Sequence, residues 1–153
     1  MEDIYGDFWQ AFLEETGTPE TTVLEHYTYF GGSEDASVQV LEQLLSGEKT
    51  AVSHCIPAYL TKKQRMPREN DYTMVTDFYG NPCCILHTTG VTIAPMPELP
   101  EELMQADVPG CTRDSWLRDR TAEYEKLAEK SGFHFHPEIP VLMETVERVY
   151  PVK

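Results

Sequence analysis

The residues best suited to chemistry are five bases that gather between positions 49 and 68, with no acid among them. Clustered Lys and Arg side chains meet phosphate groups, and an aromatic ring among them, here Tyr59, is able to stack on a base. This pattern favours a local phosphate-binding surface. The alternative is a solvated loop whose cations neutralise an acidic half of the chain. The five bases are Lys49, Lys62, Lys63, Arg65 and Arg68.

The remaining charge is acidic and unevenly placed. The chain of 153 residues has 12 Lys and Arg against 26 Asp and Glu, which gives a formal net charge of −14. Residues 1–48 hold eleven of these acids and no Lys or Arg. Such a field repels phosphate, which weighs against a protein that binds nucleic acid or an anionic membrane over its whole surface. The acidic segment fits equally well a protein-interaction module whose N-terminal helices contact a basic partner.

Metal and ATP chemistry find little support. His134-Phe-His136 and the pair Cys83-Cys84 offer nominal ligands, but the CxxC and HExxH spacings of metal sites are absent from the sequence. The segment 46–50 contains Gly-x-Lys-Thr without the upstream glycine of a P-loop, and it follows a predicted helix rather than a strand. We therefore expect no metal, no other cofactor and no ATP hydrolysis.

The sequence also indicates where the protein works. It contains no run of about 18 apolar residues, and its N-terminus is acidic where a signal peptide carries positive charge. We expect a cytoplasmic protein without a membrane partner. Its four cysteines are then expected as free thiols, because Cys83 and Cys84 are adjacent and a domain of this size needs no disulfides.

Helices and strands that would position the basic window can be predicted from periodicity and caps. Apolar residues between Ile4 and Leu13 follow a helical spacing, and Ser33 caps a second helix that ends near Gly47 and delivers the chain to the basic window. Further along, the sequence predicts a hairpin (71–78 with 83–93), a mostly irregular stretch (94–110) with one helical turn (101–106), a helix from Thr112 to Gly132 and a last strand (141–149).

Several of these segments, in this order, resemble the ASCH family, small domains with the PUA-like fold. The first two are Phe8-Trp-Gln-Ala-Phe-Leu13 and Leu44-Leu-Ser-Gly-Glu-Lys-Thr-Ala-Val-Ser53. Asp71-Tyr72 with Ile85-Leu-His-Thr-Thr-Gly-Val91 follows, and Pro140-Val-Leu-Met-Glu-Thr-Val-Glu-Arg-Val-Tyr150 closes the set. The resemblance implies an α+β fold: a small, mixed, mostly antiparallel β-barrel flanked by helices. It implies one domain over residues 1–153, with an N-terminal helical segment (about 1–47) packed on the barrel.

The resemblance also implies a ligand cleft into which Lys49 projects. Some family members are similar to amidohydrolases that deacylate N4-acetylcytidine through a Lys, Thr and Glu trio, and others are similar to ribonucleases. Lys49 matches the lysine of that trio, whereas Val52 and His87 stand where the threonine and the glutamate are expected. Valine has no lone pair with which to attack a carbonyl. Ser53 points to the opposite face of an extended segment, so it replaces that hydroxyl only where the backbone is irregular.

Three functional hypotheses follow. In the first, the barrel cleft binds RNA, a nucleotide or a modified nucleoside, with Lys49 and the bases at 62–68 on phosphate, and needs no catalytic activity. In the second, a hydrolase of the amide or phosphodiester type uses Lys49 with His87 as base and a hydroxyl from Ser53 or Thr112. The alternative for Thr112 is a helix cap. The third is the protein-interaction module described above.

Overall fold

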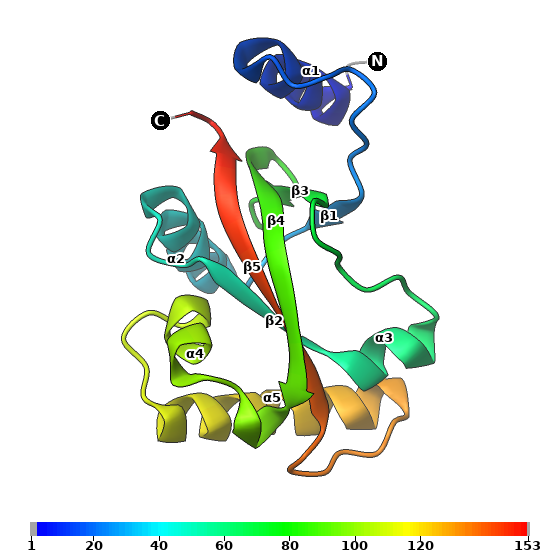
Figure 1. The fold of residues 1–153 in the computed structure, drawn as a ribbon, viewed down its shortest axis with the longest axis vertical. Coiled ribbons are helices and arrows are strands. Elements are labelled where there is room, and N and C mark those ends of the chain that lie inside the picture. Colours follow the sequence, from blue (N-terminus) through cyan, green and yellow to red (C-terminus); the bar gives the residue numbers. More distant parts are fainter. Residues whose placement is uncertain (1–2, 153) are drawn as a thin grey trace. The chain divides into compact units, whose positions relative to one another are not determined.

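The fold was analysed in a computed structural model, which describes residues 3–152. Figure 1 labels its elements in chain order, and strands β4 and β5 are the longest of the sheet. The helices are α1 (Ile4–Thr16), α2 (Glu34–Ser46), α3 (Ile56–Lys62), α4 (Glu101–Asp107) and α5 (Arg113–Ser131), with a single 3-10 turn, η1 (Met96–Glu98). The strands are β1 (His26–Thr28), β2 (Ala51–Cys55), β3 (Tyr72–Thr76), β4 (Pro82–Pro95) and β5 (Pro140–Tyr150).

The five strands form one mixed sheet in the order β1-β3-β4-β5-β2. β1 pairs with β3 in parallel, whereas β3–β4 and β2–β5 are antiparallel. This architecture confirms the predicted α+β class with a mixed, mostly antiparallel sheet flanked by helices. The predicted hairpin is confirmed as β3 and β4, with a register shift between Val75 and Thr76.

Two compact units divide the chain, and β4 and β5 each contribute residues to both. Unit 1 comprises residues 1–48, 70–89 and 146–153, and unit 2 comprises residues 49–69 and 90–145. Unit 1 buries an aromatic-rich cluster around Phe12, Leu13 and Ile85. Unit 2 buries a larger cluster in which Trp116 and Tyr124 of α5 pack with residues of β2, α4 and β5. The prediction of a single domain over the whole chain stays a prediction.

Caps at the helix ends confirm the boundaries that local residue types predicted. The Ser33 side chain accepts a hydrogen bond from Ala36 N, and Gly47 ends α2 in the left-handed conformation with φ 85°. Thr112 and Ser115 form a capping box at the start of α5, and Gly132 ends that helix with φ 81°. Both glycines lie in the region where a Cβ atom would introduce strain.

The basic window differs from the expected loop. Residues 51–62 of the window fold into β2 and α3, whereas Lys49, Thr50 and the residues beyond Lys62 lie outside helices and strands. α3 has Pro57 in its first turn, and Lys63 stops it with φ 56°. The stretch 94–110 also has more regular structure than expected, because η1 and α4 occupy much of it. The single helical turn predicted there is α4.

Candidate functional site

Lys49 is held by a buried carboxylate in unit 2. Its side chain is 6% exposed, and its ammonium donates to the Asp107 main-chain oxygen at 2.6 Å and to Asp107 Oδ1 at 2.7 Å. Asp107 is the last residue of α4, which packs against β2. The Lys49 ammonium is therefore buried and forms an ion pair with the Asp107 carboxylate.

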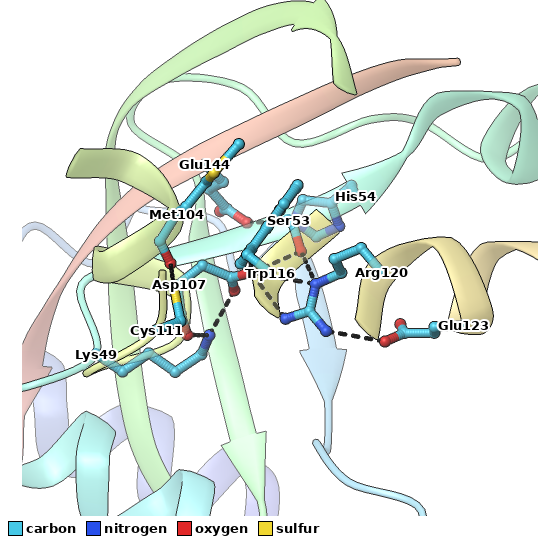
Figure 2. A network of polar contacts seen from close by, with 10 residues as sticks. All are labelled: Lys49, Ser53, His54, Met104, Asp107, Cys111, Trp116, Arg120, Glu123 and Glu144. Atoms are coloured by element: carbon cyan, nitrogen blue, oxygen red, sulfur yellow. Dashed lines mark hydrogen bonds and ion pairs between the residues drawn. The ribbon is translucent and has the colours of Figure 1, made fainter. Parts of the chain in front are cut away.

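The second oxygen of the same carboxylate accepts hydrogen bonds from three more side chains, as Figure 2 shows. Asp107 Oδ2 accepts from Ser53 Oγ at 2.9 Å, from Trp116 Nε1 at 2.9 Å and from Arg120 Nη2 at 2.7 Å. Arg120 Nε also donates to Ser53 Oγ at 3.0 Å. One buried charge thus joins β2 to α4 and α5, which lie much later in the chain.

This environment shifts the pKa values of the cluster. Burial alone would raise the pKa of Asp107, but Lys49 and Arg120 outweigh it and lower that pKa to about 2. Burial lowers the pKa of Lys49, and Asp107 opposes this shift. Burial would also lower the pKa of Arg120, yet Asp107 and Glu123 raise it. A carboxyl this acidic is a weak general base at neutral pH, so the Ser53 hydroxyl gains little activation from it.

The register of β2 against β5 separates Ser53 from Val52. Ser53 lies opposite Met143 on the face of the sheet that meets Asp107, whereas Val52 lies opposite Glu144 on the other face. The pairing of β2 with β5 is regular over these residues. The Ser53 hydroxyl therefore does not take the place of a hydroxyl at position 52.

A second polar chain occupies the Val52 face. His54 Nε2 lies 2.8 Å from Glu144 Oε1, and the Tyr59 hydroxyl lies 2.7 Å from His54 Nδ1. A carboxylate only accepts, so Nε2 donates to Glu144 and Nδ1 accepts the Tyr59 hydroxyl in the neutral ring. Burial raises the pKa of Tyr59 to about 12. Tyr59, expected as a stacking surface, therefore uses its hydroxyl to hold α3 against β2.

A groove in unit 2 gathers the later part of the basic window. Its volume is about 530 Å³, and Arg65 and Arg68 are the two cationic side chains that line it. Both arginines are exposed. The remaining lining combines apolar side chains with one amide and one acid: Gln64, Met66, Pro67, Glu69, Val91, Ile93 and Leu142. Because Leu142 pairs with His54 in the β2–β5 register, the groove and the Tyr59–His54–Glu144 chain share one face of the sheet.

The other predicted residues lie elsewhere. Lys62 and Lys63 are exposed at the end of α3. Thr112 serves as the N-cap of α5, as its alternative interpretation predicted. His87 belongs to unit 1, where Nδ1 lies 3.1 Å from Glu147 Oε1 and Nε2 lies 3.2 Å from Asn70 Oδ1. Because a carboxylate only accepts, Nδ1 donates its hydrogen bond to Glu147.

The structure therefore brings Lys49 and Ser53 to one carboxylate, and Arg65 and Arg68 to one groove. Sequence reasoning missed the residues that complete these two places, which are Asp107 and Arg120 at the carboxylate and Val91, Ile93 and Leu142 in the groove. It also missed Glu144, the partner of His54. Among residues 3–152, His, Cys, Asp and Glu side chains do not gather in threes in a way that could hold a metal ion. Within the same residues, the helices are too short or too polar to cross a membrane. The four cysteines are free thiols.

Comparison with known proteins places this fold and sequence in a family. A family model described as the ASCH domain matches residues 26–150. The chain therefore belongs to the ASCH domain family, whose domain is PUA-like. No curated protein matches the chain significantly.

Solved structures share this fold. The ASCH domain from Lactobacillus crispatus JV V101 superposes with a TM-score of 0.87 at 22% identity, over 98% of this chain and 96% of that chain. Protein EF3133 from Enterococcus faecalis V583, of family DUF984, superposes with a TM-score of 0.83 at 23% identity, over 95% of this chain and 89% of its own. Hypothetical protein PH0355 is more distant, with a TM-score of 0.54 at 15% identity, over 80% of this chain and 97% of its own.

Proposed function

We propose that this ASCH domain binds a nucleotide, a modified nucleoside or short single-stranded RNA in the groove of unit 2. The observation that carries the proposal is the pairing of two arginines with apolar side chains around a hollow of about 530 Å³. Guanidinium groups match phosphate oxygens, and an apolar wall accepts the face of a base. A volume of this size falls in the range of small-ligand sites, about 300–1,000 Å³.

The distribution of charge supports the same surface. Unit 2 contains ten Lys and Arg against twelve Asp and Glu, whereas unit 1 contains two against fourteen. A polyanion therefore meets far less repulsion at unit 2. The association of ASCH domains in general with nucleic acids agrees with this choice.

In this proposal Lys49 has a structural role, whereas the sequence predicted that it contacts the ligand. Its hydrogen bonds to Asp107 tie the residues that lead into β2 to the end of α4 within unit 2, so it supports the scaffold on which the groove is built. Direct binding of the ligand by Lys49, and hydrolysis through His87 with Ser53 or Thr112, remain predictions. Binding is the better-supported function because Ser53 is engaged with Asp107 and Arg120.

The test is a titration of a labelled single-stranded RNA decamer, followed by fluorescence anisotropy at several salt concentrations. Arg65→Ala and Arg68→Ala should each weaken binding and reduce the slope of log K against log salt by about 0.7 for each phosphate that the variant no longer neutralises. Unlabelled mononucleotide should compete. The control is Lys126→Ala, which removes an exposed base on α5 in the same unit but outside the groove.

Two outcomes would contradict the proposal: unchanged RNA binding in both arginine variants, or an equal loss in Lys126→Ala. The same proteins incubated with N4-acetylcytidine measure hydrolysis separately. Acetate release that disappears in His87→Ala would favour the hydrolase hypothesis over binding alone.

A further inference from the structure

A second concavity lies within unit 1 and is lined by tyrosines. Tyr5 on α1, Tyr27 on β1 and Tyr29 just after β1 surround a hollow of about 420 Å³, and Thr28 and Thr76 complete its wall. Tyr27 is 60% exposed and Tyr29 is 56% exposed. Clustered aromatic rings left open to solvent are typical of a binding surface.

The rings of this tyrosine hollow are held by interactions within the same unit. The Tyr5 hydroxyl donates to Gly80 O at 2.6 Å, and the rings of Tyr5 and Tyr27 meet edge to face with centroids 5.7 Å apart. Tyr29 meets Phe78 edge to face at 6.3 Å. Because these interactions already fix the ring planes, a ligand would lose little affinity to ordering them.

Carboxylates adjoin the aromatic rings. Phe78 packs edge to face on Tyr79 at 5.6 Å, and the Tyr79 hydroxyl donates to Glu34 Oε2 at 2.8 Å. Hydrogen bonds from Asn81 lower the pKa of Asp77, which follows Thr76 directly. The hydrogen bond to Glu34 raises the pKa of Tyr79, and the charge of Asp77 adds to this effect. The surface beside the hollow is therefore negatively charged at neutral pH.

We propose that the tyrosine hollow binds a Lys or Arg side chain from a basic peptide segment of a partner protein. The faces of aromatic rings attract cations, and nearby carboxylates add to that attraction. The surplus of acids in unit 1 disfavours nucleic acid there, because its phosphates would be repelled. A second copy of the chain is disfavoured by its own charge of −14.

This inference goes beyond the proposed nucleotide site and is independent of it. All the residues that line the hollow belong to unit 1, and all those that line the groove belong to unit 2. It also makes the third sequence hypothesis more specific, because charge alone predicted a basic partner without indicating where its side chains would bind.

The experiment uses three synthetic decapeptides, in which Gly alternates with Arg, Lys or Glu, titrated by isothermal calorimetry. The Arg and Lys peptides should bind more weakly as salt increases, and the Glu peptide should not bind. Tyr27→Leu should reduce affinity by about two- to five-fold, and the double variant Tyr27→Leu/Tyr29→Leu by about tenfold. Tyr27→Phe keeps the ring and should bind like the original protein. Glu125→Gln, an exposed acid on α5 in unit 2, is the charge control.

Each alternative outcome would overturn the proposal. Equal peptide binding by the leucine variants would show that the rings take no part, and equal loss in Glu125→Gln would show that only overall charge matters. If free choline binds through Tyr27 while the peptides do not, the hollow belongs to a small organic cation. If RNA binding, rather than peptide binding, depends on Tyr27, the hollow stacks bases instead. Circular dichroism of each variant confirms that the fold is intact.

Discussion

Replacing Asp107 by Asn tests the buried charge cluster that organises unit 2. The substitution keeps the size of the side chain but removes the negative charge that Lys49, Arg120, Ser53 and Trp116 surround. Two cations then face a neutral amide in a position where Asp107 is only 3% exposed. Removing one partner of a buried ion pair costs about 3–5 kcal/mol, so we expect the free energy of unfolding to fall by that amount.

The same carboxyl gives the original protein a specific acid sensitivity. Its pKa is about 2 in the fold against 3.8 for an ordinary Asp, a difference worth about 2 kcal/mol of stability. A lowered folded pKa means that this stability is fully present above pH 3.8 and declines as the pH falls towards 2. Asp107 governs the effect, because its own pKa lies in this range. Asp107→Asn has no carboxyl to titrate and should lack this part of the acid dependence.

The assay is urea unfolding of both proteins at pH 7, 5, 4 and 3. Asp119→Asn is the control, because that exposed acid on α5 pairs with exposed Arg118 at the surface, where changes usually stay within about 0.5 kcal/mol. The reasoning is refuted if Asp107→Asn costs less than about 1 kcal/mol at pH 7. It is also refuted if the difference between Asp107→Asn and the original protein does not narrow as the pH falls.

Two further predictions concern a helix cap and a thiol. Thr112→Ala removes the acceptor for Ser115 N and should lower stability by about 1 kcal/mol in urea unfolding, while Thr112→Ser keeps it. An alanine variant as stable as the original protein would contradict the capping role. Burial raises the pKa of Cys84 to about 12, so a disulfide reagent should label half-buried Cys83 before buried Cys84, as read by mass spectrometry. Equal labelling rates in the native protein would argue against this burial.

The helix ends could be predicted from sequence because their causes are local. Ser33 and Gly47 delimit α2, and Thr112 and Gly132 delimit α5, each through hydrogen bonds or backbone conformations within one turn. The parallel pairing of β1 with β3 could not be predicted in this way, because it joins residues 47 positions apart. α3 was missed because it is short and because Cys55, at its N-cap position, makes no side-chain capping hydrogen bond.

The site was predicted less well, because the partner of a charged side chain can lie far away in the sequence and is known only from the fold. The basic window includes Lys49 and Arg65 alike, and the sequence predicted that both of them meet phosphate. The fold buries Lys49 against Asp107, which lies 58 residues away, and leaves Arg65 exposed along a groove. Asp107 itself gave no signal, because the Pro-rich segment around it was expected to be irregular. Sequence position thus identified a cationic segment but not which of its charges face solvent.

The two proposed sites can be separated by crossing their variants, because each relies on charges and rings confined to one unit. Arg65→Ala removes a cation from unit 2 and should weaken RNA binding while leaving the Arg peptide bound at the tyrosine hollow. Tyr27→Leu removes an aromatic face from unit 1 and should weaken the peptide while leaving RNA binding unchanged. A general change in net charge cannot produce this pattern, because Tyr27→Leu alters no charge at all. If either variant loses both ligands, the two surfaces do not act separately. In that case the division of charge between the units does not determine which ligand each unit binds.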